Sequence, residues 1–225
     1  MATLGADFYA RPVLEVARDL IGCTVQHEGC AGVIVETEAY HESEPACHAF
    51  VGLTPRTETL FGEPGRAYVY RSYGIHALLN AVCEPEGVGA AVLIRALDPV
   101  SGVELMRARR TAAGNGTALA DEELCSGPGK LTQALGVWLS DNGTSLAHGP
   151  IVVRSRVGRA SEPSIVQAAP RVGINRAVEL PWRFCLAGSR HVSRPRPTEW
   201  APAEGIAPRR ARVSRTGRRR RSPTA

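Results

Sequence analysis

The amino-acid sequence predicts one domain of the α+β (mixed α/β) class. Its 225 residues, 44% of them hydrophobic and 22% charged, are enough to bury one full apolar core. Runs with the period-two alternation typical of strands are interspersed with amphipathic stretches of helical period. Strand and helix patterns do not alternate regularly, which argues against a sheet built from repeated β-α-β units.

Local patterns predict the elements in chain order. Apolar residues on one helical stripe indicate a helix from Arg11 to Ile21, and Gly22 ends it. Two strands follow, over 24–28 and 31–40, and flank Gly29-Cys30 as a hairpin. Further strands are predicted over 67–71, 77–83, 90–97, 151–156 and 183–187.

Two more helices are predicted from their start signals. Asp98-Pro99 combines an N-cap residue with a proline at the first helical position, so a helix is expected over 100–110. Ser126 before Gly127-Pro128 is a second start of this kind and precedes a helix over 129–135. We therefore expect Asp98 and Ser126 to be N-caps.

Composition and cysteine spacing narrow the class of protein. The first residues lack a basic segment followed by an apolar run, and no stretch reaches the roughly 18 apolar residues of a membrane span. We therefore expect a cytoplasmic protein. The six cysteines form no C-x-x-C pair and stand near no histidine at metal-ligand spacing, so we expect reduced, mostly buried thiols and no bound metal.

The net charge of +5 is divided unevenly along the chain. From residue 194 onward there are ten arginines and two glutamates, or +8, so residues 1–193 carry 17 basic and 20 acidic groups, or −3. We expect a lead over 1–7, a folded domain over 8–193 and a disordered tail, rich in arginine and proline, over 194–225. A polyanion is the natural partner of such a tail.

Two glutamates and a tyrosine occupy alternate positions of an otherwise apolar strand, VETEAY (35–40). Side chains two positions apart share a face of the strand and lie about 7 Å apart. Burying a carboxylate beside an aromatic ring and aliphatic side chains costs free energy, unless the carboxylate is paired with a partner. A carboxylate kept in such a place is often one that acts as an acid or a base. The alternative is an edge strand on which one or both face water, and strand parity does not choose between Glu36 and Glu38. Asn80 and Arg95, in apolar runs, also need polar partners.

Three of the five tyrosines fall within six residues, in YVYRSY (68–73). Strand alternation puts Tyr68 and Tyr70 on one face, and Tyr73 lies at the turn marked by Gly74. Flat rings stack on nucleobases, and a ring on a turn can insert between base steps. Core tyrosines with satisfied hydroxyls are the structural alternative.

Taken in chain order, these segments resemble the alkyladenine (3-methyladenine) DNA glycosylase family. The resemblance covers most of residues 8–193, and its most specific blocks are ETEAY and ELCSGPGKLTQALG. It implies a single α+β domain with a curved, mostly antiparallel sheet and flanking helices, similar to the C-terminal domain of formyltransferases. The matching segments are IVETEAY (34–40), ACHAF (46–50), TPR and LFG within 54–62, AYVYRSYGIH (67–76), LLNAV (78–82), VLIRALDP (92–99), ELCSGPGKLTQALG (123–136), RVGI (171–174) and PWRF (181–184).

The resemblance also implies a role for individual residues. Glu38 is the implied general base, and Glu36 is a neighbour that shapes the site. The implied nucleophilic water is held by Glu38, Arg95 and the main-chain carbonyl of Val172. The other implied roles are stacking of a flipped base between Tyr40 and Tyr70, contact with its edge by His48, exclusion of guanine's amine by Asn80, a DNA wedge at Tyr73, and phosphate contacts at Ser126, Gly127 and Lys130.

The implied reaction is hydrolysis of the N-glycosidic bond of an alkylated or deaminated purine flipped out of duplex DNA. An anionic carboxylate near C1′ stabilises an oxocarbenium-like sugar and orients water. Substrates of the 3-methyladenine type are expected, with hypoxanthine as a further candidate that needs an acid to protonate the leaving base. We expect a monomer that uses no cofactor, metal or membrane, binds damaged double-stranded DNA and leaves an abasic site.

Two other functions are compatible with parts of the sequence. A bifunctional glycosylase with lyase activity needs an amine nucleophile, and Lys130, the single lysine, suits a phosphate contact at a helix start better. A non-catalytic nucleic-acid-binding module would use the arginine tail for affinity and the tyrosines for stacking. Binding alone does not require the Glu38 carboxylate or the Arg95 guanidinium. Release of a base from a duplex with one alkylated purine separates the enzyme from the module.

Overall fold

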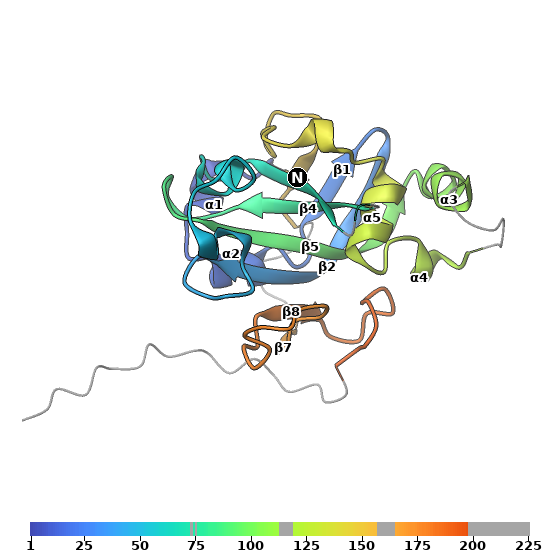
Figure 1. Ribbon diagram of the computed structural model, residues 1–225. Helices are drawn as coiled ribbons and strands as arrows, with labels where there is room; N and C mark the ends of the chain where they lie inside the picture. The colour runs from blue at the N-terminus through green and yellow to red at the C-terminus, as the bar shows by residue number, and fades with distance from the viewer. Residues whose placement is uncertain (73, 75, 113–118, 157–164, 198–225) are drawn as a thin grey trace, which may run out of the picture.

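The structure is a computed structural model that describes residues 1–72, 74, 76–112, 119–156 and 165–197 (Figure 1). A curved antiparallel sheet with flanking helices forms one α+β domain, as predicted. The strands are β1 (Thr24–His27), β2 (Cys30–His41), β3 (Ala67–Ser72), β4 (His76–Val82), β5 (Ala90–Ser101), β6 (Val152–Arg154), β7 (Val166–Ala169) and β8 (Arg183–Leu186). The helices are α1 (Ala6–Tyr9), α2 (Val13–Asp19), α3 (Val103–Ala112), α4 (Asp121–Leu124) and α5 (Pro128–Leu135), with 3-10 turns η1 (His48–Val51), η2 (Glu58–Phe61) and η3 (Leu139–Asp141).

Strand β2 lies in the middle of the sheet, whose order is β3-β4-β5-β2-β1-β6. It pairs with β5 along one side, and along the other side with β1 near its start and with β8 at Glu36–Glu38. The β7–β8 pair therefore extends the sheet alongside the part of β2 that carries both glutamates. Glu36 and Glu38 are completely buried, which rules out the alternative of a water-facing edge strand.

A tight turn joins β1 to β2 where a hairpin is predicted. His27 pairs with Cys30, so the two-residue loop is Glu28-Gly29 rather than Gly29-Cys30. Both loop residues have positive φ, 44° for Glu28 and 78° for Gly29. This backbone matches the right-handed twist of the flanking strands and favours glycine at the second position. The turn sets the register of β1 against β2 as far as Val33.

Both predicted N-caps are wrong. Asp98 and Pro99 continue β5 to Ser101, and α3 begins only at Val103. The proline is tolerated because the register shifts beside it, and strands accept proline at such bulges. Helix α5 begins with Pro128 at its first position, but its N-cap is Gly127, which has no side chain to donate or accept a bond.

The two faces of the central strands contact different apolar clusters. Helices α2 and α5 pack on one face, where Ala39, Leu79 and Ile94 belong to the main core. The opposite face contacts a smaller cluster that includes Tyr68 and lies beside Tyr40 and Tyr70. Because strand side chains alternate, the period that buries Ala39 against α2 turns Glu38 and Tyr40 toward the second face. This face holds the candidate site.

Segments from both ends of the described chain are held by the domain. Leu4 donates its N–H to the carbonyl of Val153 at 3.0 Å, so the predicted lead over 1–7 contacts the sheet edge. Ser193 is buried, and the carbonyl of Pro195 accepts a bond from Arg183 Nη1 at 3.0 Å. The folded part thus continues past the expected boundary at residue 193. Residues 198–225, which make up most of the predicted tail, lie outside the described residues.

The six cysteines are free and buried. Burial raises the pKa of Cys47, Cys125 and Cys185 to about 12, so these thiols stay protonated at neutral pH. Among the residues placed by the structure, no three histidine, cysteine or carboxylate side chains gather as metal ligands would. No helix within those same segments is long and apolar enough to cross a bilayer.

Candidate active site

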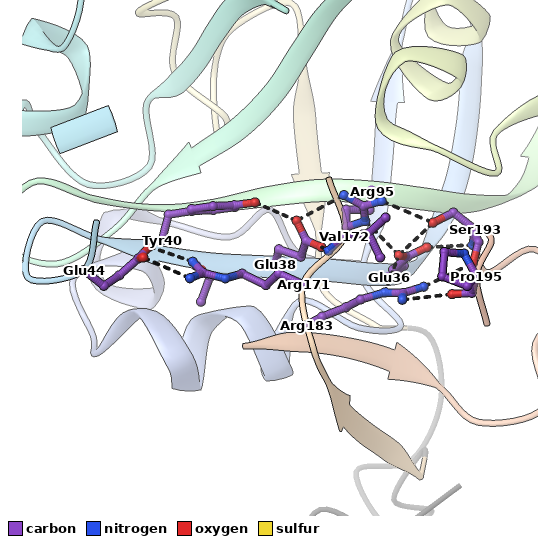
Figure 2. Close-up of polar contacts among 11 residues, drawn as sticks. Glu36, Glu38, Tyr40, Glu44, Arg95, Arg171, Val172, Arg183, Ser193 and Pro195 are labelled. Atoms are coloured by element: carbon purple, nitrogen blue, oxygen red, sulfur yellow. Dashed lines mark hydrogen bonds and ion pairs between the residues drawn. The ribbon is translucent and has the colours of Figure 1, made fainter. Parts of the chain in front are cut away.

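Glu38 is a fully buried carboxylate that receives three hydrogen bonds (Figure 2). Its Oε2 accepts from the Tyr40 hydroxyl at 2.8 Å and from Arg95 Nη1 at 3.1 Å. Its Oε1 accepts from the Val172 N–H at 2.7 Å. A carboxylate has about four lone-pair sites, so these donors fix the group in one orientation, and within the described part of the chain one site on Oε1 is left for another donor.

Glu36 has the same parity on β2 but a different environment. Its Oε1 accepts from Arg95 Nε at 2.8 Å, from Arg183 Nε at 2.7 Å and from the Ser193 hydroxyl at 2.9 Å. Its Oε2 accepts from the Ser193 N–H at 2.7 Å. Burial alone would raise the pKa of Glu36, but the charges of Arg95 and Arg183 and the Ser193 N–H hold it below its ordinary value. Glu36 is thus a charged structural group that accepts four hydrogen bonds from the described residues.

Arg95 connects the two glutamates. Its guanidinium donates through Nε to Glu36, through Nη1 to Glu38 and through Nη2 to the Ser193 hydroxyl at 3.4 Å. Burial lowers the pKa of Arg95, but the two carboxylates outweigh that effect and raise it above its ordinary value. The guanidinium therefore stays charged between two anions. These carboxylates are the polar partners that the sequence predicts for an arginine within an apolar run.

A pocket of about 730 Å³ opens above this network. Sites for small molecules typically enclose roughly 300–1,000 Å³, so a nucleobase fits. Tyr40, Arg95 and Val172, the three donors to Glu38, all line the pocket, whereas Glu38 lies behind them. All four predicted base-contacting residues also line this pocket: Tyr40, His48, Tyr70 and Asn80.

Aromatic side chains from β3 and η1 form one wall of this pocket. The rings of Tyr68 and Tyr70 are stacked with centroids 5.2 Å apart, so their predicted common face is confirmed. The His48 ring contacts Tyr70 edge-on at 4.7 Å. Burial raises the pKa of Tyr70 to about 12. The wall is therefore uncharged at neutral pH and offers ring faces to a base.

His48 is held as a neutral imidazole. Burial and the nearby Arg56 guanidinium lower its pKa below the ordinary value. Arg56 Nη2 lies 3.5 Å from Nε2, and because a guanidinium can only donate, we assign the ring proton to Nδ1, 3.2 Å from the Tyr68 hydroxyl. Arg56, which was not singled out from sequence, therefore contacts Nε2 of the His48 ring.

Asn80 is buried in β4, opposite Tyr68 on β3 and Leu93 on β5. Its Nδ2 donates to the carbonyl of Tyr68 at 3.0 Å, which fixes the orientation of the amide. The polar partner expected for this residue is thus a backbone carbonyl. Its position on the pocket wall is compatible with the implied contact to a base.

The start of α5 forms another part of the rim. Pro128 and Gly129 line the pocket, whereas Lys130 is exposed beside it. A Cβ on Gly129 would stand 2.8 Å from the His76 ring, so only glycine permits this approach of helix and strand. The backbone N–H groups at a helix start suit a phosphate. Of the predicted phosphate contacts, Gly127 is the N-cap and Ser126 pairs with Ala96, the neighbour of Arg95.

Comparison with known proteins agrees with this geometry. Residues 7–190 match the family described as methylpurine-DNA glycosylase. A protein of Rhodopseudomonas palustris strain BisB18 is 55% identical over 193 residues, covering 85% of this chain and 91% of its own. Proteins of Bradyrhizobium diazoefficiens (51% identical, 84% and 90% covered) and Methanoculleus marisnigri (50%, 85% and 99%) are similar. Each carries the provisional name 3-methyladenine DNA glycosylase.

The chain belongs to the methylpurine-DNA glycosylase family. The predicted resemblance is confirmed, and with it the reading of the chain as a glycosylase rather than a non-catalytic binding module. Tyr73, the predicted wedge of this methylpurine-DNA glycosylase, lies outside the described residues. The roles of the individual residues stay predictions.

Sequence reasoning missed several polar residues of the site. Arg171 lies next to Val172 in the RVGI segment and pairs with Glu44, but neither was singled out. Arg183 and Ser193 bind Glu36 from β8 and from the segment that follows it. One signal was available, because two carboxylates in one buried strand require more than one cation. This signal does not identify which arginines of the chain pair with the two glutamates.

The free energy of unfolding should depend on pH through Glu36. Because its folded pKa lies below the ordinary value of 4.5, its stabilising contribution is complete above that pH and is lost as the pH falls through the folded value. We expect the wild type to lose stability on acidification below about pH 4.5, and Glu36→Gln, which lacks this titration, to lose it less steeply. Urea unfolding across a pH series measures both slopes. Parallel slopes would contradict the assignment.

Proposed function

We propose that this chain hydrolyses the N-glycosidic bond of alkylated purines, of the 3-methyladenine class, in double-stranded DNA. One observation carries the proposal. Glu38 is fully buried behind a base-sized pocket, and the three donors that orient it all line that pocket. This arrangement supports a role for Glu38 in polarising a water molecule next to a bound nucleotide.

The reaction follows from the groups around Glu38. The free lone pair on Oε1 accepts a proton from water, the water oxygen attacks C1′, and the electrons of the C1′–N bond leave with the base. The negative charge of Glu38 stabilises the oxocarbenium-like sugar formed as that bond breaks. Arg95 and Val172 keep the carboxylate oriented. The implied contact of water with the Val172 carbonyl would come from the same residue whose N–H binds Glu38.

Substrate choice follows from the leaving group. An N-alkylated purine in DNA is a cation, so it departs as a neutral base without a general acid. The tyrosine hydroxyls on the pocket stay protonated, because burial raises the pKa of both Tyr40 and Tyr70. Tyr40 commits its proton to Glu38. This supports alkylated purines as the principal substrates and hypoxanthine as a slower one.

The product is an intact abasic strand, and one polypeptide is enough to make it. Lys130, the only lysine, is exposed on α5 and does not line the pocket, which argues against Schiff-base chemistry at C1′. The Glu38 network and the pocket lining lie within one chain, so the proposed reaction requires no residue of a second copy. Tyr73 is proposed to fill the space that a flipped nucleotide leaves in the duplex.

The decisive experiment is a base-release assay on three duplexes that differ at one position: 3-methyladenine, hypoxanthine and adenine. We expect fastest release of 3-methyladenine, slower release of hypoxanthine and none of adenine. Strand breaks should form only after alkali, since a monofunctional enzyme leaves the backbone intact. Failure to release any alkylated purine would refute the proposed activity.

We propose that the segment beyond Pro197 is a non-specific DNA arm. It contains eight arginines and two glutamates, a net charge of +6. Arginines that contact phosphates without reading bases raise the affinity for damaged and undamaged duplexes alike. Truncation after Pro197 should weaken both by similar factors, and each lost phosphate contact should reduce the log–log salt slope by about 0.9.

The cut must follow Pro197 because Ser193 and Pro195 belong to the Glu36 network. The matched control keeps the full length and replaces the eight tail arginines with glutamine. It should behave like the truncation in a salt titration of binding, while single-turnover excision at saturating enzyme stays at the wild-type rate. An unchanged salt slope would show that the tail is not a DNA arm.

A further inference from the structure

Arg171 is a buried arginine that contacts Tyr40 from behind the pocket (Figure 2). Its guanidinium carbon lies 4.7 Å from the centroid of the Tyr40 ring and 5.4 Å from that of Trp182. Arg171 itself does not line the pocket, whereas Tyr40 does. One contact with the ring that is proposed to stack on the base therefore comes from this cation.

Glu44 fixes the guanidinium in a single orientation. Arg171 donates through Nη1 to Oε1 at 2.6 Å and through Nη2 to Oε2 at 2.9 Å, the paired geometry that arginine forms with carboxylates. Both side chains are almost fully buried, with exposed fractions of 0% and 6%. Among the residues that the structure describes, the buried Nε atom of Arg171 has no hydrogen-bond partner. The pair with Glu44 therefore places the Arg171 guanidinium beside the rings of Tyr40 and Trp182. It does so without using every hydrogen-bond donor of the guanidinium.

The same guanidinium also binds the backbone of the strand that carries Glu38. Nη1 donates to the carbonyl of Ala39 at 2.9 Å, and Ala39 stands between Glu38 and Tyr40 in β2. Arg171 directly precedes Val172 in the chain, and the Val172 N–H binds Glu38. Arg171 thus contacts the Tyr40 ring and strand β2 through its side chain and belongs to the loop whose backbone binds Glu38.

We infer that the buried Arg171–Glu44 pair is a positioning element that aligns the Tyr40 ring and the Val172 N–H with Glu38. This inference rests on the proposed function for its kinetic consequence, and on the geometry alone for its structural one. A buried pair can often be replaced by apolar side chains with little loss of stability, so stability by itself does not require these residues. Alignment of the site does require them, because a small displacement of a catalytic group lowers the reaction rate.

The test compares the double variant Arg171→Met/Glu44→Leu with wild type and with Ile151→Ala. The double variant removes both charges together, so no unpaired ion is left in the interior. Ile151 is a fully buried residue of the main core and takes no part in the site, so its truncation controls for loss of stability. All three proteins are compared at a temperature at which each is folded.

The first readout is independent of activity. Amide hydrogen exchange at Val172 reports the bond to Glu38, and we expect it to become about 10-fold faster or more in the double variant and to stay unchanged in Ile151→Ala. The second readout is single-turnover release of 3-methyladenine at saturating enzyme, expected to fall by about 10- to 100-fold in the double variant only. The third is the ratio of affinities for damaged and undamaged duplexes, which should fall as stacking on Tyr40 weakens.

A general weakening of the fold would lower both affinities together and leave their ratio unchanged. Wild-type exchange at Val172, or an excision rate within about twofold of the Ile151→Ala control, would overturn the inference. Absence of base release by the wild type would refute the proposed function instead, and the exchange rate would still decide whether the pair positions Val172. The two failures are therefore distinguishable.

Discussion

Replacing Glu38 with glutamine is expected to lower the single-turnover rate of base release by about 10²–10⁴-fold, because the amide neither accepts the proton of water as a base nor carries the charge that stabilises the sugar cation. The side chain keeps its size, so affinity for a lesion duplex should change much less. Quenched-flow or gel measurement of base release at saturating enzyme gives the rate, and fluorescence anisotropy gives the affinity.

The matched control is Glu42→Gln. Glu42 follows Tyr40 by two positions and accepts the Gly89 N–H at 2.8 Å, a bond that glutamine can keep through its amide oxygen. It should excise at close to the wild-type rate. If Glu38→Gln were as active as this control, the carboxylate would not be the general base, and another group of the pocket would have to activate water.

Replacing Arg183 with methionine is expected to have the largest effect on stability. It removes one of two cations from the buried carboxylate of Glu36 and leaves the carbonyls of Ser193 and Pro195 without their donor. Breaking a buried pair typically costs about 3–5 kcal/mol, which corresponds to a fall in melting temperature of about 10 °C for a domain of this size. Equilibrium unfolding in urea and calorimetry measure both quantities.

The control for this change is Arg66→Met. Arg66 also pairs with a glutamate, Glu63, but both side chains are largely exposed, at 41% and 61%. Exposed pairs of this kind contribute about 0–1 kcal/mol. Equal losses for Arg183→Met and Arg66→Met would contradict the view that burial of Glu36 makes its partners indispensable.

Local sequence patterns predicted the elements whose signals are complete within a few residues. The β1–β2 hairpin has alternating strands and a glycine in its turn, and the common face of Glu38 and Tyr40 follows directly from strand alternation. Short elements carried too little signal. Strand β7 has four residues and each 3-10 turn at most four, which spans only one or two periods of such a pattern.

The candidate site was predicted only in part, for a physical reason. Partners that lie far apart in sequence leave no local pattern, and Arg183 and Ser193 bind Glu36 across 147 and 157 residues. Alternation assigned Glu36 and Glu38 to one face but could not separate their roles. Their surroundings differ, because Arg183 and Ser193 bind Glu36, whereas donors that line the pocket bind Glu38.

Glu36 and Ser193 lie far apart in the sequence, and this separation affects the order in which the domain folds during synthesis. Synthesis starts at the N-terminus, so β2 leaves the ribosome long before the residues that compensate Glu36. Contacts between residues so distant in the chain form late, because closing the intervening loop costs entropy first. The Glu36 network is therefore expected to be among the last parts to assemble, and until it does, Arg95, which also orients the proposed general base Glu38, lacks its Ser193 partner.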